Sequence, residues 1–438
     1  MRPWSSIVVL SGLLFLAQAI QPLRAFAEGI KTYTLKESIA EAFANNWALK
    51  ATAEKVDQAV FVKNQARAEF LPKLSTSYGY ARLNEAPTIK SLYNLQIGTE
   101  DNYQWESKVT QPLFTGFALL SSYRLAQLGI DESEMELEKK KLDLALEVKR
   151  AYFGILTVDA GVGAAEKAVE ALDSHANVAR SHYKVGMIPI NDLLQSEVEL
   201  GNAQHDEIKV RNNARLARSR FNTVLSRPVN APVNVKDVPI HKIQKPSFQE
   251  YVQDALRNLP EIKLIDISLQ QVDQAKTMAK SNYYPEVVFE WSYTREGDTP
   301  SVSGSLYHDE SAWQAMAGLS WTFWEWGKTY YSVKEQESLK SELLKTKMEL
   351  EKIIELQIKD AVLSLETAEA NIPITKKAVE QGEENLRVSQ ERYKAQVSTS
   401  TEVLDAQRYL TRARVNHFTS LYEYHLAVAK LLRAVGAY

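Results

Sequence analysis

Apolar and polar positions follow a helical period in some parts of the chain and a period of two in others, and this alternation occurs twice. A capping box at residues 34–37 opens a stretch that is expected to run as one helix to Leu71, before Pro72. A second capping box at residues 247–250 opens an equivalent stretch that stops at Pro285. After each proline the period changes to two, which predicts that a strand follows each helix.

Four segments of about 10 residues alternate between apolar and polar side chains and are predicted to be strands. They pair as two hairpins, 74–81 with 103–110 and 287–294 with 313–323. The connecting residues are rich in Gly, Pro, Ser and Asn, as expected for loops. Each hairpin therefore has one apolar face, on which aromatic residues are frequent: Tyr78, Tyr80, Tyr103, Trp105, Trp291, Tyr293, Trp313 and Trp321.

A long helical stretch follows each strand pair, over residues 118–183 and again over 328–396. At ~1.5 Å per residue, the first would measure ~100 Å. Gly161-Val162-Gly163 and Asn371-Ile372-Pro373 interrupt the two stretches at matching places, which predicts a shared kink. Shorter return helices are expected over 191–226 and 402–435.

The two halves of the chain repeat each other with an offset of 210 residues, which takes Tyr183 to Tyr393. The helical row at positions 169, 172, 176, 179 and 183 falls on positions 379, 382, 386, 389 and 393. This pattern indicates an internal duplication. We expect a first repeat over 28–227, a linker over 228–246 with four prolines, and a second repeat over 247–438.

Composition and charge exclude several classes of protein. The 438 residues include no cysteine, so disulfides, thiolate metal sites and a lipid anchor on an N-terminal Cys are excluded. The formal net charge of −3 gives no reason to expect nucleic acid as a partner. Arg2, an apolar core over 7–20 and Ala25-Phe26-Ala27 predict a signal peptide over 1–27, because a core of roughly 14 residues is too short to span a bilayer. We expect an exported chain with no transmembrane helix.

An apolar face on an open sheet predicts that several chains combine. Open sheet edges are excluded from lipid, so the strands must close into a barrel, and four strands are too few. Three copies would give a barrel of about 12 strands, whereas two would reach the minimum of about 8 and leave no room for a pore. The expected lipid-facing belt consists of Tyr78, Tyr80, Trp105, Trp291, Trp313 and Trp321. A soluble β-sandwich would bury the same alternation but would not need such long helices.

No catalytic chemistry is predicted. The sequence has no glycine-rich phosphate loop and no nucleophile motif, so neither an enzyme nor a cofactor is expected. His175 and His182 lie two helical turns apart, and His417 and His425 are similarly scattered. This spacing favours solvated or lightly packed histidines over a metal site.

Three acidic residues, Asp192, Glu402 and Asp405, lie in the first turns of the predicted return helices. A favourable interaction with a helix N-terminus, well under ~1 kcal/mol each, is enough to explain them. Threefold symmetry offers a second interpretation. Three copies of each carboxylate around one axis would form an acidic ring, and such a ring at a constriction selects cations and acts as a gate.

The chain resembles the TolC-like outer-membrane efflux protein family from Thr34 to Gly436. Four motifs in order carry the resemblance: Leu71-Pro72 before a strand, Gln111-Pro112-Leu113-Phe114-Thr115-Gly116 at a strand end, the Tyr183-Lys184-Val185-Gly186-Met187 tip and the Glu402-Val403-Leu404-Asp405-Ala406-Gln407 return. The resemblance implies a mostly α homotrimer, with a 12-stranded β-barrel in the cell outer membrane and an α-helical tunnel in the periplasm. It also implies two partners, a periplasmic adaptor (membrane fusion) protein and an inner-membrane pump.

The resemblance also assigns roles to the two helical tips. Adaptor docking is expected at Val185, Gly186, Met187, Ile188, Val397, Ser398 and Thr399. Asp192, Glu402 and Asp405 match acidic positions near the periplasmic entrance of the family. Ser398 stands where the family often has a basic residue, so the resemblance does not imply a salt-bridge lock at that position.

The expected function is the exit duct of a tripartite efflux or type I secretion system, a passive conduit with a periplasmic gate. One alternative is a periplasmic coiled-coil scaffold or adaptor without a pore, and the aromatic strand faces argue against it. The other alternative is a free-standing porin. A porin does not need helices of ~100 Å, which argues against that function.

Overall fold

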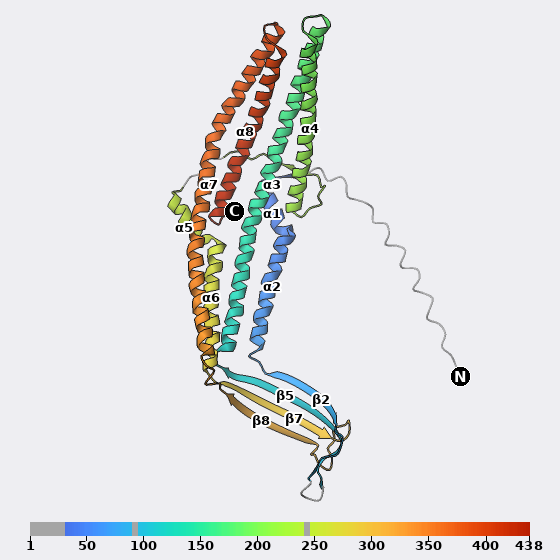
Figure 1. Ribbon diagram of the computed structural model, residues 1–438, viewed down its shortest axis with the longest axis vertical. Coiled ribbons are helices and arrows are strands. Elements are labelled where there is room, and N and C mark those ends of the chain that lie inside the picture. The colour runs from blue at the N-terminus through green and yellow to red at the C-terminus, as the bar shows by residue number, and fades with distance from the viewer. Residues whose placement is uncertain (1–30, 90–94, 241–245) are drawn as a thin grey trace, which may run out of the picture.

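The computed structural model describes residues 31–89, 95–240 and 246–438. Long helices form one end of the molecule and a twisted sheet forms the other (Figure 1). The predicted signal peptide over residues 1–27 lies outside the described residues. Within the described ranges, no helix has an apolar stretch long enough to cross a membrane.

Both predicted capping boxes are present, at the start of α1 (Leu35–Asn45) and of α5 (Phe248–Asn258). The expectation of one helix up to Leu71 is wrong, because Asn46 separates α1 from α2 (Trp47–Ala68). The Asn46 side chain accepts a hydrogen bond from the Leu49 amide and donates one to the Val224 carbonyl. In the second repeat, Leu259 separates α5 from α6 (Pro260–Lys280), which begins on a proline.

The two predicted hairpins form one antiparallel sheet in the order β2-β5-β7-β8. Its strands are β2 (Lys73–Arg82), β5 (Asp101–Thr115), β7 (Glu286–Gly297) and β8 (Ser311–Ser320). Pairing of β5 with β7 joins the two repeats. The last strand ends at Ser320, so Trp321 and Phe323 lie beyond it, contrary to the predicted strand end. A short hairpin of β3 (Thr88–Ile89) and β4 (Leu95–Gln96) extends the first connection.

The register of the sheet places the predicted apolar positions on one face. Tyr78 pairs with Trp105, and Trp291 pairs with Val109 on one side and Ala315 on the other. Directly paired residues project to the same face of a sheet. On the opposite face, Lys108 and Glu290 form an ion pair at 2.8 Å. The sheet therefore has one aromatic face and one polar face.

The long helices of the two repeats match in length and position. α3 (Ala118–Lys184) and α7 (Lys328–Lys394) have 67 residues each, and α4 (Ile190–Val224) and α8 (Ser400–Ala434) have 35 residues each. All four bounds differ by the offset of 210, which confirms the duplication. α3 and α7 continue through 161–163 and 371–373, so these residues do not end either helix, and the shared kink there stays a prediction. Near Pro373, the Thr375 hydroxyl lies 2.9 Å from the Ser420 hydroxyl of α8, so contact with α8 supports the helix there.

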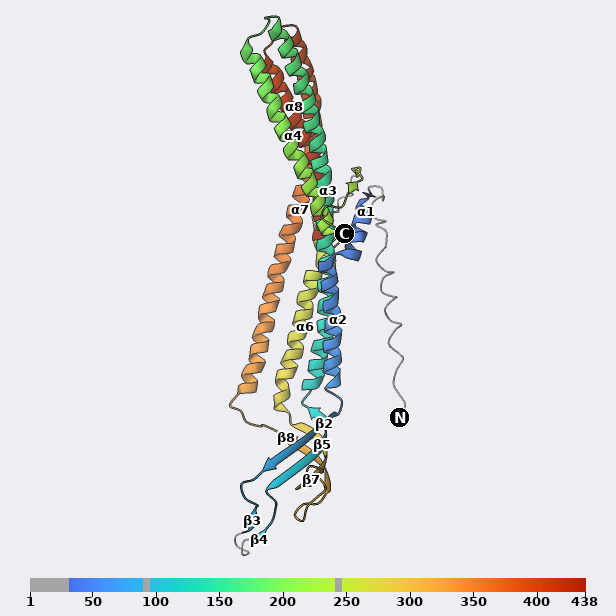
Figure 2. The same ribbon diagram turned by 90° about the vertical axis from the view of Figure 1, so that its right-hand side faces the viewer.

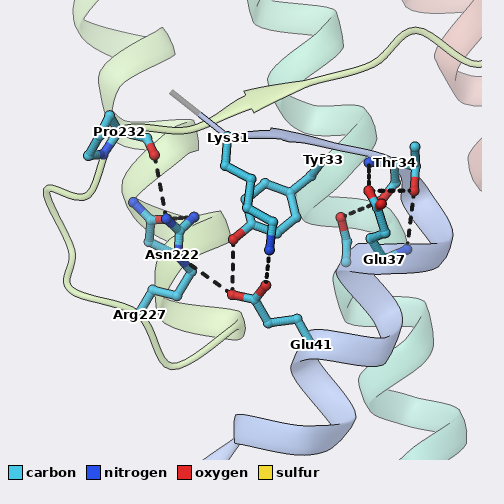
Figure 3. A network of polar contacts seen from close by, with 9 residues as sticks. Lys31, Tyr33, Thr34, Glu37, Glu41, Asn222, Arg227 and Pro232 are labelled. Atoms are coloured by element: carbon cyan, nitrogen blue, oxygen red, sulfur yellow. Dashed lines mark hydrogen bonds and ion pairs between the residues drawn. The ribbon is translucent and has the colours of Figure 1, made fainter. Parts of the chain in front are cut away.

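The main hydrophobic core lies midway along the molecule, where α1, α3 and the end of α4 meet the linker. β1 (Thr32–Tyr33) pairs with β6 (Asn234–Val235) of the linker. Figure 3 shows the polar network beside this pair, in which Glu41 accepts a hydrogen bond from the Tyr33 hydroxyl at 3.0 Å and pairs with Lys31 and Arg227. The strand pair attaches the linker to β1, and the contacts of Glu41 join residues 31–33 and Arg227 to α1.

Candidate functional site

The candidate site is the pair of helical tips at the end of the molecule farthest from the sheet (Figures 1 and 2). At the first tip, Gly186 adopts φ +75° and Met187 donates its amide to the His182 carbonyl. At the second tip, Gln396 adopts φ +63° and Val397 donates to the Arg392 carbonyl. The same left-handed turn thus ends α3 and α7, with a glycine in one repeat and a glutamine in the other.

The predicted adaptor-docking residues lie on these turns. Val185 is 67 % exposed, Val397 is 65 % exposed, and Met187 is also exposed. A Cβ placed on Gly186 would meet nothing within 4 Å, so this side of the tip is open. Ile188 and Ser398 are half-buried and Thr399 is exposed. The turns form a small apolar surface that is accessible within the single chain.

The predicted gate acids lie on both hairpins, Asp192 on α4 and the other two on α8. Glu402 accepts a hydrogen bond from the Ser398 hydroxyl at 2.7 Å and lies 3.5 Å from the Arg392 guanidinium. The resemblance implied no salt-bridge lock at Ser398. Its neutral hydroxyl instead donates a hydrogen bond to the Glu402 carboxylate.

The other α8 acid, Asp405, pairs with Arg408 at 2.8 Å, and Arg408 also lies 3.3 Å from Glu199. The side chains of Glu402 and Asp405 are nearly half exposed. Both acids on α8 therefore have cationic partners in their own chain but remain open to solvent.

A buried histidine occupies the space between the hairpins, which the expectation of solvated or lightly packed histidines missed. His175 of α3 is 6 % exposed, and its Nε2 lies 2.7 Å from the Ser400 hydroxyl of α8. Burial and, to a smaller extent, the neighbouring His182 together lower the pKa of His175 from its ordinary value to about 4. One sequence signal could have found it, because His175 follows Leu172 by three residues on the buried row of α3.

Tyr393 of α7 covers this histidine. Its ring centroid lies 4.8 Å from that of His175 and 5.7 Å from that of His182. The Tyr393 hydroxyl and His182 Nδ1 are buried and have no hydrogen-bond partner among the described residues. Burial, followed by the nearby Asp192 carboxylate, raises the pKa of Tyr393. The interior of the tip is thus polar and incompletely hydrogen-bonded.

At the other end of the molecule, the predicted lipid-facing belt is uncovered. Tyr78, Tyr80, Trp291, Trp313 and Trp321 are exposed in the single chain, and Trp105 is half-buried. Trp321 donates its indole N–H to the Tyr283 carbonyl at 3.3 Å, which holds it just beyond β8. In the described ranges, no cluster of three or more His, Asp or Glu residues is arranged to hold a metal ion.

Comparison with known proteins identifies the family. Residues 38–226 and 251–437 match the model of the outer membrane efflux protein family. Outer membrane protein TolC of Vibrio cholerae serotype O1 is 20% identical over 435 residues, covering 97% of this chain and 94% of that protein. Outer membrane protein TolC of Escherichia coli K12 is 22% identical over 437 residues, covering 94% of this chain and 84% of that protein.

A solved structure has the same fold. The Campylobacter jejuni CmeC outer membrane channel superposes with a TM-score of 0.80 at 16% identity, covering 92% of this chain and 85% of that one. The expected outer-membrane location and efflux duct are therefore confirmed, and the chain belongs to the outer membrane efflux protein family.

Proposed function

We propose that three copies of this chain form the exit duct of a tripartite efflux or type I secretion system. In this proposal the duct is a passive conduit rather than an enzyme. Its strands close a barrel of about 12 strands in the outer membrane, and its helices form a tunnel in the periplasm. The observation that carries the proposal is a four-stranded sheet with an uncovered aromatic face and two unpaired edges, β2 and β8.

The sheet supports closure by several chains. Leu74 and Trp313, on the edge strands β2 and β8, are among the most exposed apolar residues of the molecule. An aromatic face of this kind is suited to lipid, but lipid excludes the unpaired edges on either side of it. Pairing of β8 with β2 of the next copy would satisfy both edges, and three copies would leave room for a lumen lined by the polar face.

The helices also support a trimer. Large apolar side chains are exposed along the outside of α2, α4 and α7, including Phe61, Val198 and Leu356. Such residues on a long helix are typical of a surface that packs against another helix. In the proposed trimer they are covered by the neighbouring copies. The repeats over 28–227 and 247–438, joined by the linker 228–246, would then alternate around the tunnel.

The tips would serve as both gate and docking site. Three copies of Asp192, Glu402 and Asp405 would surround the axis at the periplasmic entrance, where repulsion between carboxylates is relieved by bound cations or protonation. The turns at residues 185–188 and 397–399 would receive a periplasmic adaptor, because their small apolar surface allows another helical hairpin to approach closely. An inner-membrane pump would deliver the cargo through that adaptor.

Single-channel recording in a planar bilayer, combined with the mass of the purified protein in detergent, tests the proposal. We expect a trimer that conducts in discrete steps. A stable folded monomer that retains its β-structure would contradict closure by several chains. A trimer without conductance would instead favour the periplasmic scaffold, and a conducting trimer that binds no adaptor would favour the free-standing porin.

A further inference from the structure

We propose that His175 is a proton-sensitive contact between the two helical hairpins of one chain. In its neutral form the ring joins α3 to α8 and α4 through two serine hydroxyls. When the ring is protonated, the hairpins separate at the tip. The proposal concerns the same end of the molecule as the proposed gate, but it rests on contacts within a single chain.

The donor in each of these hydrogen bonds can be assigned. Ser196 of α4 lies 2.8 Å from the Asp192 carbonyl, which only accepts, so the Ser196 hydroxyl donates its single proton there. The Ser400 hydroxyl, 2.9 Å from that of Ser196, therefore donates to Ser196. The remaining donor for Ser400 is His175 Nε2, at 2.7 Å. This order assigns the proton of the neutral ring to Nε2.

The chain of hydrogen bonds crosses from one hairpin to the other twice. His175 and Ser196 belong to the α3–α4 hairpin, and Ser400, between them, belongs to the α7–α8 hairpin. All three side chains are buried. A hydrogen-bonded group that is removed from water is costly to disturb, so these contacts hold the hairpins together while the ring is neutral.

The same interior also favours separation. The Tyr393 hydroxyl and His182 Nδ1 have no hydrogen-bond partner in the described part of the chain. Each would gain hydrogen bonds to water if the hairpins parted. The joined and separated hairpins therefore differ less in free energy than they would if the interior were fully hydrogen-bonded. One added charge can then favour the separated form.

The titratable groups around His175 do not stabilise a positive charge. His182 of the same helix opposes it, and Tyr393 of α7 is neutral at ordinary pH. α4 contributes Asp192, which acts on Tyr393, while α8 presents the Ser400 hydroxyl. Glu402, the acid in the first turn of α8, is engaged by Ser398 and Arg392. A proton on His175 would thus be buried without a carboxylate partner.

The direction of the pH dependence follows from linkage. With the hairpins joined, the pKa of His175 is about 4, below the ordinary value of 6.5. Separation exposes the ring and returns its pKa toward that value, so the separated form binds the proton more tightly. As the pH falls from 6.5 to 4, the ratio of separated to joined hairpins rises by up to about tenfold per pH unit, and the full gain, reached below pH 4, is roughly 300-fold. Well above pH 6.5 the ratio does not change through this group.

A pair of fluorescent labels reports the separation directly. The chain has no cysteine, and Thr401 of α8 donates a hydrogen bond to Gln195 of α4 at 3.3 Å, so Q195C with T401C places two unique thiols side by side. Pyrene maleimide on both thiols gives excimer emission while the hairpins are joined. The full chain in detergent is expected to lose this emission as the pH falls from 6.5 to 4. Emission that stays constant over this range would overturn the proposal.

Variants of the labelled protein identify the titrating group. His175→Gln retains an N–H donor for Ser400 but does not titrate, so its emission should not respond to pH between 6.5 and 4. His205→Gln changes an exposed histidine on α4 and should follow the unsubstituted protein. If His175→Gln keeps the original pH response, the acidic residues titrate instead and the proposal is wrong.

A further variant keeps the histidine and removes its acceptor. Ser400→Ala should raise the separated fraction at pH 7 and move the midpoint of the acid response upward, toward 6.5. An unchanged midpoint would overturn the proposal even if His175→Gln failed to fold. Excimer emission does not depend on conductance, so failure of the proposed duct and failure of this inference give different results.

Discussion

Tyr183 and Tyr393 occupy equivalent positions in the two repeats, yet Tyr183 is 41 % exposed and Tyr393 is 3 % exposed. Both end a helix of 67 residues just before the same left-handed turn. Tyr393 points between the hairpins, where its ring lies tilted against His175 and stacks on His182 of α3. The duplicated sequence therefore forms an asymmetric tip, because the two hairpins of one chain share a single interior.

Removal of the Tyr393 hydroxyl should stabilise the tip. Tyr393→Phe keeps the ring packed against the histidines and deletes a buried hydroxyl without a described partner, and such a group costs about 1–3 kcal/mol. We expect a higher midpoint of thermal unfolding, followed by circular dichroism in detergent. Tyr183→Phe, at the exposed equivalent position, should change nothing. A lower midpoint for Tyr393→Phe would mean that a neighbouring copy supplies a partner for the hydroxyl.

Arginine on the aromatic face of the sheet should prevent membrane assembly, whereas arginine on the polar face should not. Trp291→Arg and Leu319→Arg place a charge toward lipid, at a cost of ~2–4 kcal/mol near the midplane. Gln314→Arg is the matched control on the opposite face of β8, where Gln314 pairs with Ser292. The measurement is the yield of heat-resistant oligomer in outer-membrane fractions. Equal yields for all three variants would show that the faces are assigned wrongly.

Arg433 should be important for stability where α8 meets α3 and α6. Its guanidinium bonds Asp143 at 2.7 Å and Glu261 at 2.6 Å, and the side chain is 16 % exposed. Arg433→Ala leaves Glu261 half-buried and unpaired, and leaving a polar group without its partner costs about 1–3 kcal/mol.

Thermal unfolding would reveal this loss as a clear drop in midpoint. Arg387→Ala is the control, because Arg387 also pairs with two carboxylates but on the surface, where such pairs contribute little to stability. Similar midpoints for the two variants would contradict a special role for Arg433.

The tip acids should control cation block if they line the entrance. Glu402→Gln combined with Asp405→Asn removes two carboxylates per chain and should raise conductance at neutral pH and weaken block by a trivalent cation. Bilayer recordings with and without the cation measure both effects. Glu384→Gln, an exposed acid lower on α7, should behave as the unsubstituted protein. Unchanged block in the double variant would mean that these acids only stabilise the N-terminus of their helix and do not act as a gate.

Much of the fold was determined by local patterns in the sequence. The capping boxes specified where α1 and α5 begin, because each is a contact among residues three apart. The period-two alternation specified the aromatic face, because successive side chains of a strand project to opposite sides. The duplication predicted two matched sets of helices. All of these signals lie within a few residues or in an internal comparison, so no tertiary contact was needed to find them.

Other features depend on contacts between segments that are far apart in the sequence, so only the tertiary structure determined them. The break at Asn46 is held partly by the Val224 carbonyl, 178 residues away, and α7 continues past Pro373 where Thr375 meets α8. His175 is buried because Ser400 and Tyr393 of the second repeat close over it. Sequence periodicity shows which side of a helix is apolar and will be buried, but the packing of the helices determines which segment buries it. That packing made His175 the buried histidine between the hairpins.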